Sequence, residues 1–241
     1  MPDADVIYWY MDEAGPEGAG LIGVPSTGLL SLEEQTRFNG MRFPKRRSEW
    51  LLGRVTAKTL LARCIPNLAG LPFDQITIAN HPEGAPFVSV AGQALPIQLS
   101  ISHREGMAVA AVATNPDIGL GIDLEWVEDH PRSFYEDFFT PGELIILDDI
   151  PTDRLGWAGT LIWSAKEAVL KALGKGLRLD TRTVDITSIA RTSVDGWGSF
   201  DMRIANSHNK DWHGLWREIG PYLLTLAVRN NKTRPIIKRV G

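Results

Sequence analysis

The segment Ile118-Gly-Leu-Gly-Ile-Asp-Leu-Glu125 alternates strictly between large apolar residues and other residues, which is the pattern of a β-strand with one apolar face. Its other face carries two glycines, Gly119 and Gly121, and then two carboxylates, Asp123 and Glu125. Glycines in a strand allow another backbone or a ligand to approach closely. The two carboxylates lie about 7 Å apart along a strand, and like charges repel unless a cation lies between them. The segment therefore predicts either a cation site at the end of a strand or two acids that leave the strand into solvent.

A third carboxylate comes from the segment between Leu161 and Leu173, LIWSAKEAVLKAL. Trp163, Glu167 and Lys171 are spaced by four residues and so share one face of a helix. One interpretation is an ordinary Glu–Lys pair on a solvated face, which contributes only about 0.2–0.5 kcal/mol. The tryptophan on the same face argues against free solvent and favours a site.

If Glu167 joins Asp123 and Glu125, three hard oxygen ligands converge, and this donor set suits Mg²⁺ bound jointly with a substrate phosphate. Lys171 would lie one helical turn beyond Glu167, within reach of that phosphate. The two segments together therefore indicate metal-assisted chemistry on a phosphate.

The motifs Gly121-Ile-Asp-Leu-Glu125 and Trp163-Ser-Ala-Lys-Glu-Ala-Val-Leu-Lys171, in this order, resemble those of the 4′-phosphopantetheinyl transferases, in the larger, Sfp-like subgroup. Other segments resemble further parts of the family's pattern, so that the resemblance covers about residues 43 to 177: Leu51-Leu-Gly-Arg54, Ser100-Ile-Ser-His103, Phe138-Phe-Thr-Pro-Gly-Glu143 and Gly174-Lys-Gly-Leu177.

The resemblance implies a Mg²⁺-dependent transferase that moves the 4′-phosphopantetheine arm of coenzyme A to a serine of an apo acyl or peptidyl carrier protein. The by-product would be adenosine 3′,5′-bisphosphate. The resemblance places Asp123, Glu125 and Glu167 at metal-binding positions. Glu167 also falls where the family has the base that deprotonates the carrier serine. Lys171 falls at the position that steadies the pyrophosphate. Fatty-acid, polyketide and nonribosomal-peptide pathways all remain open.

The resemblance also implies contacts with coenzyme A. Ser102 and His103 fall at coenzyme A-contacting positions, with His103 near the 3′-phosphate. Lys45 stands where the family often has a basic residue, with Arg46 beside it. Asp123 and Lys171 would contact the diphosphate end of the same ligand.

The chain departs from the family's pattern at Glu83-Gly-Ala-Pro86. The family commonly has a lysine where this chain has Ala85, and that lysine contributes to phosphate contact. Either Arg46 or Arg47 compensates for the missing cation, or coenzyme A binds more weakly.

Charge is unevenly distributed along the chain, whose formal net charge is −4. Residues 41–63 carry seven basic side chains against one acid, Glu49, whereas residues 123–153 carry ten acids against one base, Arg132. One interpretation is two solvated faces. The other interpretation is that the basic segment binds the phosphates of coenzyme A and that the acidic segment contains a cation site. Arg54, Lys58, Lys175 and Arg178 are candidates for docking an acidic carrier protein.

Composition excludes several classes of protein. With 241 residues, 44% of them hydrophobic and 22% charged, the chain is neither disordered nor collagen-like. Its net charge is of the wrong sign to indicate nucleic-acid binding. Its apolar runs are too short to span a membrane, and its first residues lack the basic start of a secretory signal. With one cysteine, Cys64, a reducing compartment follows, and we expect a cytoplasmic protein with no nucleic-acid or membrane partner.

Local patterns predict a mixture of helices and strands. Helices are expected to start at Ser31, where Glu34 completes a capping box, and at Thr140, where Pro141 and Glu143 follow. Further helices are expected over about 48–63, ended by Pro66, and over about 157–173. Strands are expected over 6–10, 97–101, 107–113 and 118–127, with more short strands between 184 and 228.

The resemblance implies an α+β fold in which two similar halves are related by a pseudo-two-fold axis, with the active site at their interface; such a chain would be a monomer. Residues 1–116 would form the half with the coenzyme A-binding basic segment. Residues 117–241 would form the half with the strand that carries Asp123 and Glu125 and the helix that carries Glu167 and Lys171. Met107–Asn115 and Leu223–Asn231, two apolar runs that end at asparagine, fit such a duplication.

Two other functions remain open. One is a relative of the same fold that binds coenzyme A or a carrier protein without catalysis, although the intact Asp123, Glu125, Glu167 and Lys171 argue against it. The other is a different metal-dependent phosphoryl-transfer enzyme, such as a phosphodiesterase, which only the outlying resemblances disfavour.

Overall fold

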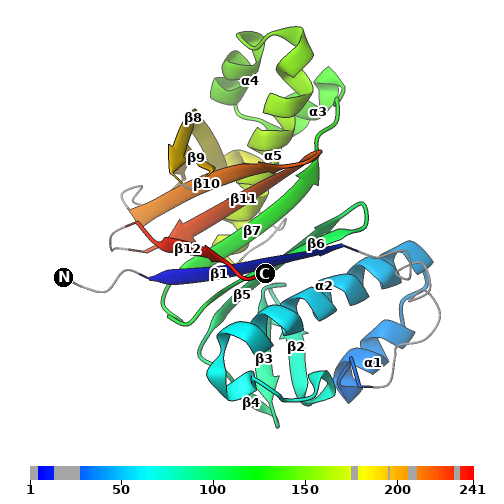
Figure 1. Ribbon diagram of the computed structural model, residues 1–241. Coiled ribbons are helices and arrows are strands. Elements are labelled where there is room, and N and C mark those ends of the chain that lie inside the picture. The colour runs from blue at the N-terminus through cyan, green and yellow to red at the C-terminus, as the bar shows by residue number, and fades with distance from the viewer. Residues whose placement is uncertain (1–4, 14–27, 175–178, 195, 206–210, 231–233) are drawn as a thin grey trace. The chain divides into compact units, whose positions relative to one another are not determined.

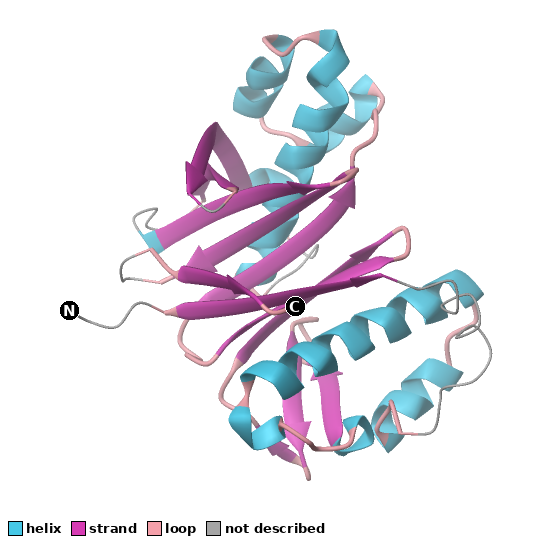
Figure 2. Cartoon of the chain, in the orientation of Figure 1, coloured by secondary structure: helices cyan, strands magenta, loops and turns pink. Residues whose placement is uncertain are grey.

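The computed structural model describes residues 5–13, 28–174, 179–194, 196–205, 211–230 and 234–241, which form a mixed α+β protein (Figures 1 and 2). The chain divides into two compact units between Pro116 and Asp117. The first unit contains Asp5–Pro116 and also Ile236–Gly241, which the sequence assigned to the C-terminal half; the second is built around Asp117–Pro235. In the part of the chain that the structure describes, no helix has the length and apolarity needed to span a bilayer.

The first unit has a four-stranded sheet in the order β12-β1-β6-β5 and a smaller one in the order β2-β3-β4. All pairs are antiparallel except that of β12 with β1. The long helix α2 (Pro44–Cys64) packs on β6, β1 and β5, after the short helix α1 (Leu32–Asn39). The strands are β1 (Val6–Glu13), β2 (Ile76–Asn80), β3 (Pro86–Val90), β4 (Gln93–Ala94), β5 (Gln98–Arg104), β6 (Met107–Ala113) and β12 (Ile236–Arg239).

The second unit has one antiparallel sheet in the order β7-β11-β10-β9-β8. The long helix α5 (Leu155–Ala172) packs on β7 and β11, so its apolar side forms the core with that sheet. The other elements are β7 (Gly119–Trp126), α3 (Arg132–Phe138), α4 (Pro141–Asp148), β8 (Val184–Val194), β9 (Trp197–Ile204), β10 (Trp212–Ile219) and β11 (Tyr222–Arg229).

The glycines of β7 allow the close approach that the sequence predicted, and the partner is the backbone of α5. A Cβ added to Gly119 would lie 2.6 Å from the carbonyl oxygen of Ala172, and one added to Gly121 would overlap the carbonyl of Ala168. Real Cβ atoms do not come so near a backbone oxygen. These two glycines therefore set the distance between the helix and the strand that carries Asp123.

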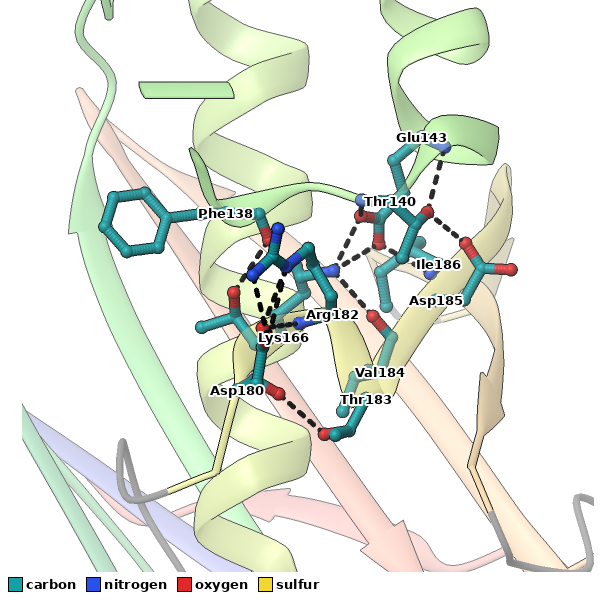
Figure 3. A network of polar contacts seen from close by, with 11 residues as sticks. Phe138, Thr140, Glu143, Lys166, Asp180, Arg182, Thr183, Val184, Asp185 and Ile186 are labelled. Carbon is teal, nitrogen blue, oxygen red and sulfur yellow. Dashed lines mark hydrogen bonds and ion pairs between the residues drawn. The ribbon is translucent and has the colours of Figure 1, made fainter. Parts of the chain in front are cut away.

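Each unit ties its long helix to a short one through a buried lysine. In the second unit, Lys166 donates to both oxygens of Glu143, at 2.9 and 2.6 Å, and to the carbonyl of Val184 (Figure 3). Glu143 is the capping-box residue of α4 and accepts the backbone N–H groups of Thr140 and Ile186. Burial lowers the pKa of Lys166, and the charge of Glu143 offsets this only in part.

The first unit repeats this arrangement. Lys58 donates to Glu34, the capping-box residue of α1, and Glu34 accepts the N–H groups of Ser31 and Ile78. The two networks also agree in spacing, because the glutamate and lysine are 24 residues apart in the first unit and 23 in the second. The glutamate and the strand N–H that it accepts are 44 and 43 residues apart. Lys58 and Lys166 therefore occupy corresponding positions.

The central hairpins of the two units also correspond. Two-residue turns join Arg104 to Met107 and Ile219 to Tyr222. Matching these turns aligns Met107 with Tyr222, one residue away from the alignment with Leu223 that the sequence suggested. A shift of one residue exchanges the two faces of a strand, so this correction decides which residues face the helix. With it, Tyr8, Tyr10 and Asp12 of β1 correspond to Gly121, Asp123 and Glu125 of β7.

Several sequence predictions are confirmed. Both capping boxes are present, and β6 has its predicted bounds. Helix α2 begins earlier than predicted, at Pro44, because proline is well suited to the first turn of a helix. The sequence predicted neither β2, β3 and β4 nor α3. Residues 175–178 of the loop after α5 lie outside the described residues.

Candidate active site

Asp123 and Glu125 lie on the face of β7 that is turned toward α5. Asp123 is buried, with 1% of its surface exposed, whereas Glu125 is half-buried. The alternation of the strand puts both on one side, and the glycines before them bring α5 close. The strand thus delivers one fully buried and one partly accessible carboxylate to the helix.

Lys171 is the direct partner of Asp123. Its Nζ lies 2.7 Å from Oδ1 of Asp123 and 3.1 Å from the carbonyl oxygen of Ile122. Burial lowers the pKa of Lys171, but the charges of Asp123, Glu167 and Glu125 and the hydrogen bond to Asp123 outweigh this effect, and the pKa is raised. One ammonium group therefore lies in the field of all three predicted carboxylates.

Asp123 is also held from the side of the helix. Ser164 of α5 donates its hydroxyl to Oδ2 of Asp123 at 2.8 Å. The hydroxyl of Ser164 lies 2.8 Å from that of Thr225 on β11, and Thr225 donates to the carbonyl of Ser164 at 2.9 Å. Ser164 and Thr225 are fully buried. No sequence pattern assigned a role to these two residues. The signal that could have found Ser164 is its place three residues before Glu167, on the same side of the helix.

An aromatic group borders the carboxylates. The indole N–H of Trp163 donates to Oε1 of Glu125 at 3.3 Å. Phe134 and Phe138 of α3 pack against Trp163 with ring centroids 5.1 and 5.3 Å away. Trp163 thus connects α3 to the site and takes part in orienting Glu125.

The chemistry of these side chains fits a divalent cation of the magnesium type, which prefers carboxylate oxygens. Asp123, Glu125 and Glu167 all contribute to the raised pKa of Lys171, whose ammonium contacts Asp123 directly. Among the residues that the structure describes, however, no three His, Cys, Asp or Glu side chains are arranged to hold a metal ion. At Asp123, the ammonium of Lys171 occupies Oδ1, at 2.7 Å.

The four predicted coenzyme A contacts outside this cluster belong to the first unit. Lys45 and Arg46 are exposed near the start of α2, and Lys45 forms an ion pair with Glu105 at 2.9 Å. His103, at the end of β5, has its Nδ1 3.9 Å from Glu49, and Ser102 beside it is buried.

Two arginines lie beside the departure at Ala85: Arg37, which no sequence pattern singled out, and Arg54, a candidate docking residue. Arg37 and Arg54 both donate to Oδ1 of Asn80, at 2.6 and 3.1 Å. Asn80 in turn donates to the carbonyl of Gly84, the residue before Ala85. Two guanidinium groups thus meet at the loop that lacks the family's lysine.

Two of the four candidate docking residues are contradicted. Lys58 is fully buried against Glu34, and Arg54 is buried over the ring of Trp50, with a centroid distance of 4.6 Å. Neither can meet a partner protein. Burial also lowers the pKa of Arg54 to about 10. Lys175 and Arg178 lie outside the described residues.

The superfamily model described as "4′-phosphopantetheinyl transferase superfamily" matches residues 119–227, which hold β7, α5 and most of β11. A holo-[acyl-carrier-protein] synthase from a Geobacillus species is 38% identical over 82 residues, which cover 33% of this chain and 69% of that protein. The chain belongs to the 4′-phosphopantetheinyl transferase superfamily.

Among the longer members of this superfamily, the 4′-phosphopantetheinyl transferase HetI from a Nostoc species is 29% identical over 152 residues, 61% of each chain. The chain thus spans about three fifths of the length of this curated relative. A holo-(acyl-carrier-protein) synthase from Bacillus anthracis, solved in complex with CoA (3′,5′-ADP), is 24% identical and covers 46% of this chain and 96% of its own. Its TM-score of 0.38 is too low to support an inference about this chain.

Proposed function

We propose that this member of the superfamily transfers the 4′-phosphopantetheine arm of coenzyme A to a serine of an apo acyl or peptidyl carrier protein, with release of adenosine 3′,5′-bisphosphate. The observation that carries the proposal is the contact of the Lys171 ammonium with Asp123, at 2.7 Å, with Glu125 on the same face of β7 and Glu167 one helical turn before Lys171 on α5. The names of the relatives, phosphopantetheinyl transferases and holo-carrier-protein synthases, support the same reaction.

In this proposal, Asp123, Glu125 and Glu167 hold Mg²⁺, which would neutralise the phosphate oxygens of the diphosphate when bound. Glu167 accepts the proton of the carrier serine as its oxygen attacks the phosphorus. Lys171 donates to the pyrophosphate and stabilises the charge that develops on the leaving group. Lys171 must then exchange at least part of its contact with Asp123 for a contact with the ligand.

Further contacts to coenzyme A are proposed from the sequence resemblance. Lys45, Arg46, Ser102 and His103 are the proposed contacts, with His103 directed to the 3′-phosphate. Arg37 and Arg54, rather than Arg46 or Arg47, supply positive charge beside Ala85, because they are the pair that meets at this loop. We further propose a monomer that acts in the cytoplasm.

The decisive experiment incubates the protein with coenzyme A, Mg²⁺ and a set of apo carrier proteins and follows the intact mass of the carrier. The expected result is that the carrier gains the mass of one phosphopantetheine arm. No gain is expected when a chelator is present from the start of the reaction. The Glu167→Gln variant should keep the fold, as judged by circular dichroism, and lose the transfer. A fully active Gln variant would remove Glu167 from its proposed role.

One observation favours a second candidate, a non-catalytic relative that binds coenzyme A or a carrier. No three metal-binding side chains within the described ranges are arranged to hold an ion, and Lys171 already neutralises Asp123. This candidate predicts that coenzyme A binds with equal affinity with and without Mg²⁺ and that no carrier gains mass.

A further inference from the structure

We infer that Ser164 and Thr225 form a hydroxyl pair that positions the carboxylate of Asp123, and that the pair is part of the reactive site rather than of the general fold. Both are positioning residues, since they act through Asp123. The inference rests on the proposed function, in which Asp123 holds the metal, and it adds two residues to which neither the motifs nor the relatives gave a role.

The number of hydroxyl protons limits the directions that the hydrogen bonds of Ser164 and Thr225 can take. Three short contacts join Asp123, Ser164 and Thr225, but the two hydroxyls have only two protons between them. An ionised carboxylate only accepts, so the proton of Ser164 goes to Oδ2 of Asp123. The proton of Thr225 then goes either to the hydroxyl or to the carbonyl of Ser164. In the first case Thr225 holds the side chain of Ser164 in the rotamer that faces Asp123, and in the second it holds the backbone of Ser164.

These contacts fix the orientation of the carboxylate plane of Asp123. With Oδ2 held by Ser164, the other oxygen, Oδ1, is the one presented to the positive charge of Lys171. All three residues of the group are at most 1% exposed, so water does not compete for these contacts. Outer partners of this kind typically change metal affinity by about 10–100-fold when they are removed.

The first unit provides an internal comparison that separates site from fold. Counting from the corresponding lysines, Ser164 matches Thr56 of α2, and the hairpin alignment matches Thr225 with Ala110 and Asp123 with Tyr10. Thr56 donates to the carbonyl of Leu52, one turn back on its own helix, at 2.8 Å. This is the usual choice for a hydroxyl inside a helix.

Ser164 instead reaches across to the sheet, and it does so in the unit where a carboxylate is present. The buried Lys–Glu pair occurs in both units and thus belongs to the fold. The contacts among Asp123, Ser164 and Thr225 occur in one unit and follow the carboxylate. This difference assigns the hydroxyl pair to the site.

The test compares Ser164→Ala, Thr225→Val and Thr225→Ser with the control Thr56→Val. Binding of Mn²⁺ in the presence of coenzyme A, followed by the paramagnetic signal of the free ion, reports on the metal without any turnover. The Mg²⁺ dependence of transfer and the KM for coenzyme A are measured in parallel, with thermal unfolding as the check of the fold.

We expect Ser164→Ala to weaken Mn²⁺ binding by about 10–100-fold and to raise the Mg²⁺ concentration needed for half-maximal transfer by a similar factor, with the KM for coenzyme A unchanged. Thr225→Val should change both in the same direction by a smaller factor. Thr225→Ser, which keeps the hydroxyl, should restore wild-type binding, and Thr56→Val should leave it unchanged.

Three outcomes would overturn the inference. If the wild type binds Mn²⁺ and both Ser164→Ala and Thr225→Val bind it equally well, the pair does not position Asp123. If Thr56→Val weakens Mn²⁺ binding as much as Thr225→Val, the effect is one of general stability. If the wild type binds no Mn²⁺ but still binds coenzyme A, the metal part of the proposed function fails, and the inference fails with it.

Discussion

The two units of the chain share a hairpin with a two-residue turn, a long helix on its face, and a buried lysine that joins this helix to the capping glutamate of a shorter one. They differ where the long helix meets the first strand of the unit. At corresponding positions the first unit has Tyr8 and Tyr10, and the second has Gly121 and Asp123.

The basic residues at corresponding positions of the two long helices also have different partners. Arg63 of α2 lies over the ring of Tyr10, 4.8 Å from its centroid, whereas Lys171 of α5 bonds to Asp123. Thr59 of α2 corresponds to Glu167. Each unit thus has a cation near this point of the sheet, and Asp12 corresponds to Glu125. The carboxylates of Asp123 and Glu167, in contrast, are matched in the first unit by Tyr10 and Thr59. The features that both units share thus serve stability, and the features that differ are those proposed for catalysis.

The largest effect should come from the feature that both units share. Lys166→Met leaves Glu143 as a buried charge without its lysine partner, and Lys58→Met leaves Glu34 with only the longer contact to Arg54, at 3.8 Å. Each change should lower the free energy of unfolding by about 3–5 kcal/mol, measured by chemical denaturation. A loss in one unit and none in the other would break the proposed equivalence.

The next effect concerns the contact of β7 with α5. Gly121→Ala drives a methyl group into the backbone of α5 and should cost about 3 kcal/mol of stability, together with transfer activity. Gly142→Ala is the matched control, because the atom nearest to its added Cβ lies 3.5 Å away. Thermal unfolding of both variants checks this, and equal melting temperatures would show that α5 does not need the glycine.

A smaller, pH-dependent effect is expected at Lys171. Its pKa is raised in the folded state, so the stability that it contributes is fully present below the unfolded-state value of about 10.5 and is lost as the pH rises through the folded-state value. The difference in unfolding free energy between wild type and Lys171→Met should amount to about 1–3 kcal/mol, remain constant from neutral pH to about 9.5, and shrink only above about 10.5. A difference that shrinks near pH 8 would contradict the raised pKa.

The smallest effect is expected at the exposed pair of Lys45 and Glu105. Exposed ion pairs contribute little to stability, so Glu105→Gln should leave the melting temperature unchanged. It should free Lys45 for an anionic ligand and lower the KM for coenzyme A by less than about tenfold. An increase in KM would show that Glu105 holds Lys45 in its binding position.

Local sequence patterns predicted much of the fold. Ser31 with Glu34 and Thr140 with Glu143 are capping boxes because both partners lie within one helical turn, and both are present. Strand β7 was predicted because its alternation is complete over eight residues. The short strands β2, β3 and β4 were missed, since their five residues or fewer give little periodicity.

The candidate site was predicted in part. Asp123, Glu125, Glu167 and Lys171 carry regular spacings on one strand and one helix, which a sequence displays directly. Thr225 has no such signal, because its place depends on the pairing of β11 with β7. The burial of Lys58 and Arg54 was equally hidden, since charged side chains are seldom buried unless a partner distant in the chain meets them.

The most direct test of this account compares phosphopantetheine transfer by Asp123→Asn and by Tyr10→Phe, the corresponding position of the other unit. With coenzyme A, Mg²⁺ and an apo carrier protein, the rate of mass gain is measured for both variants and the wild type, after unfolding curves have confirmed their folds. We predict a loss of at least about 100-fold for Asp123→Asn and a rate near that of the wild type for Tyr10→Phe. A folded Asp123→Asn variant that transfers as fast as Tyr10→Phe would contradict the assignment of the chemistry to the carboxylates of the second unit.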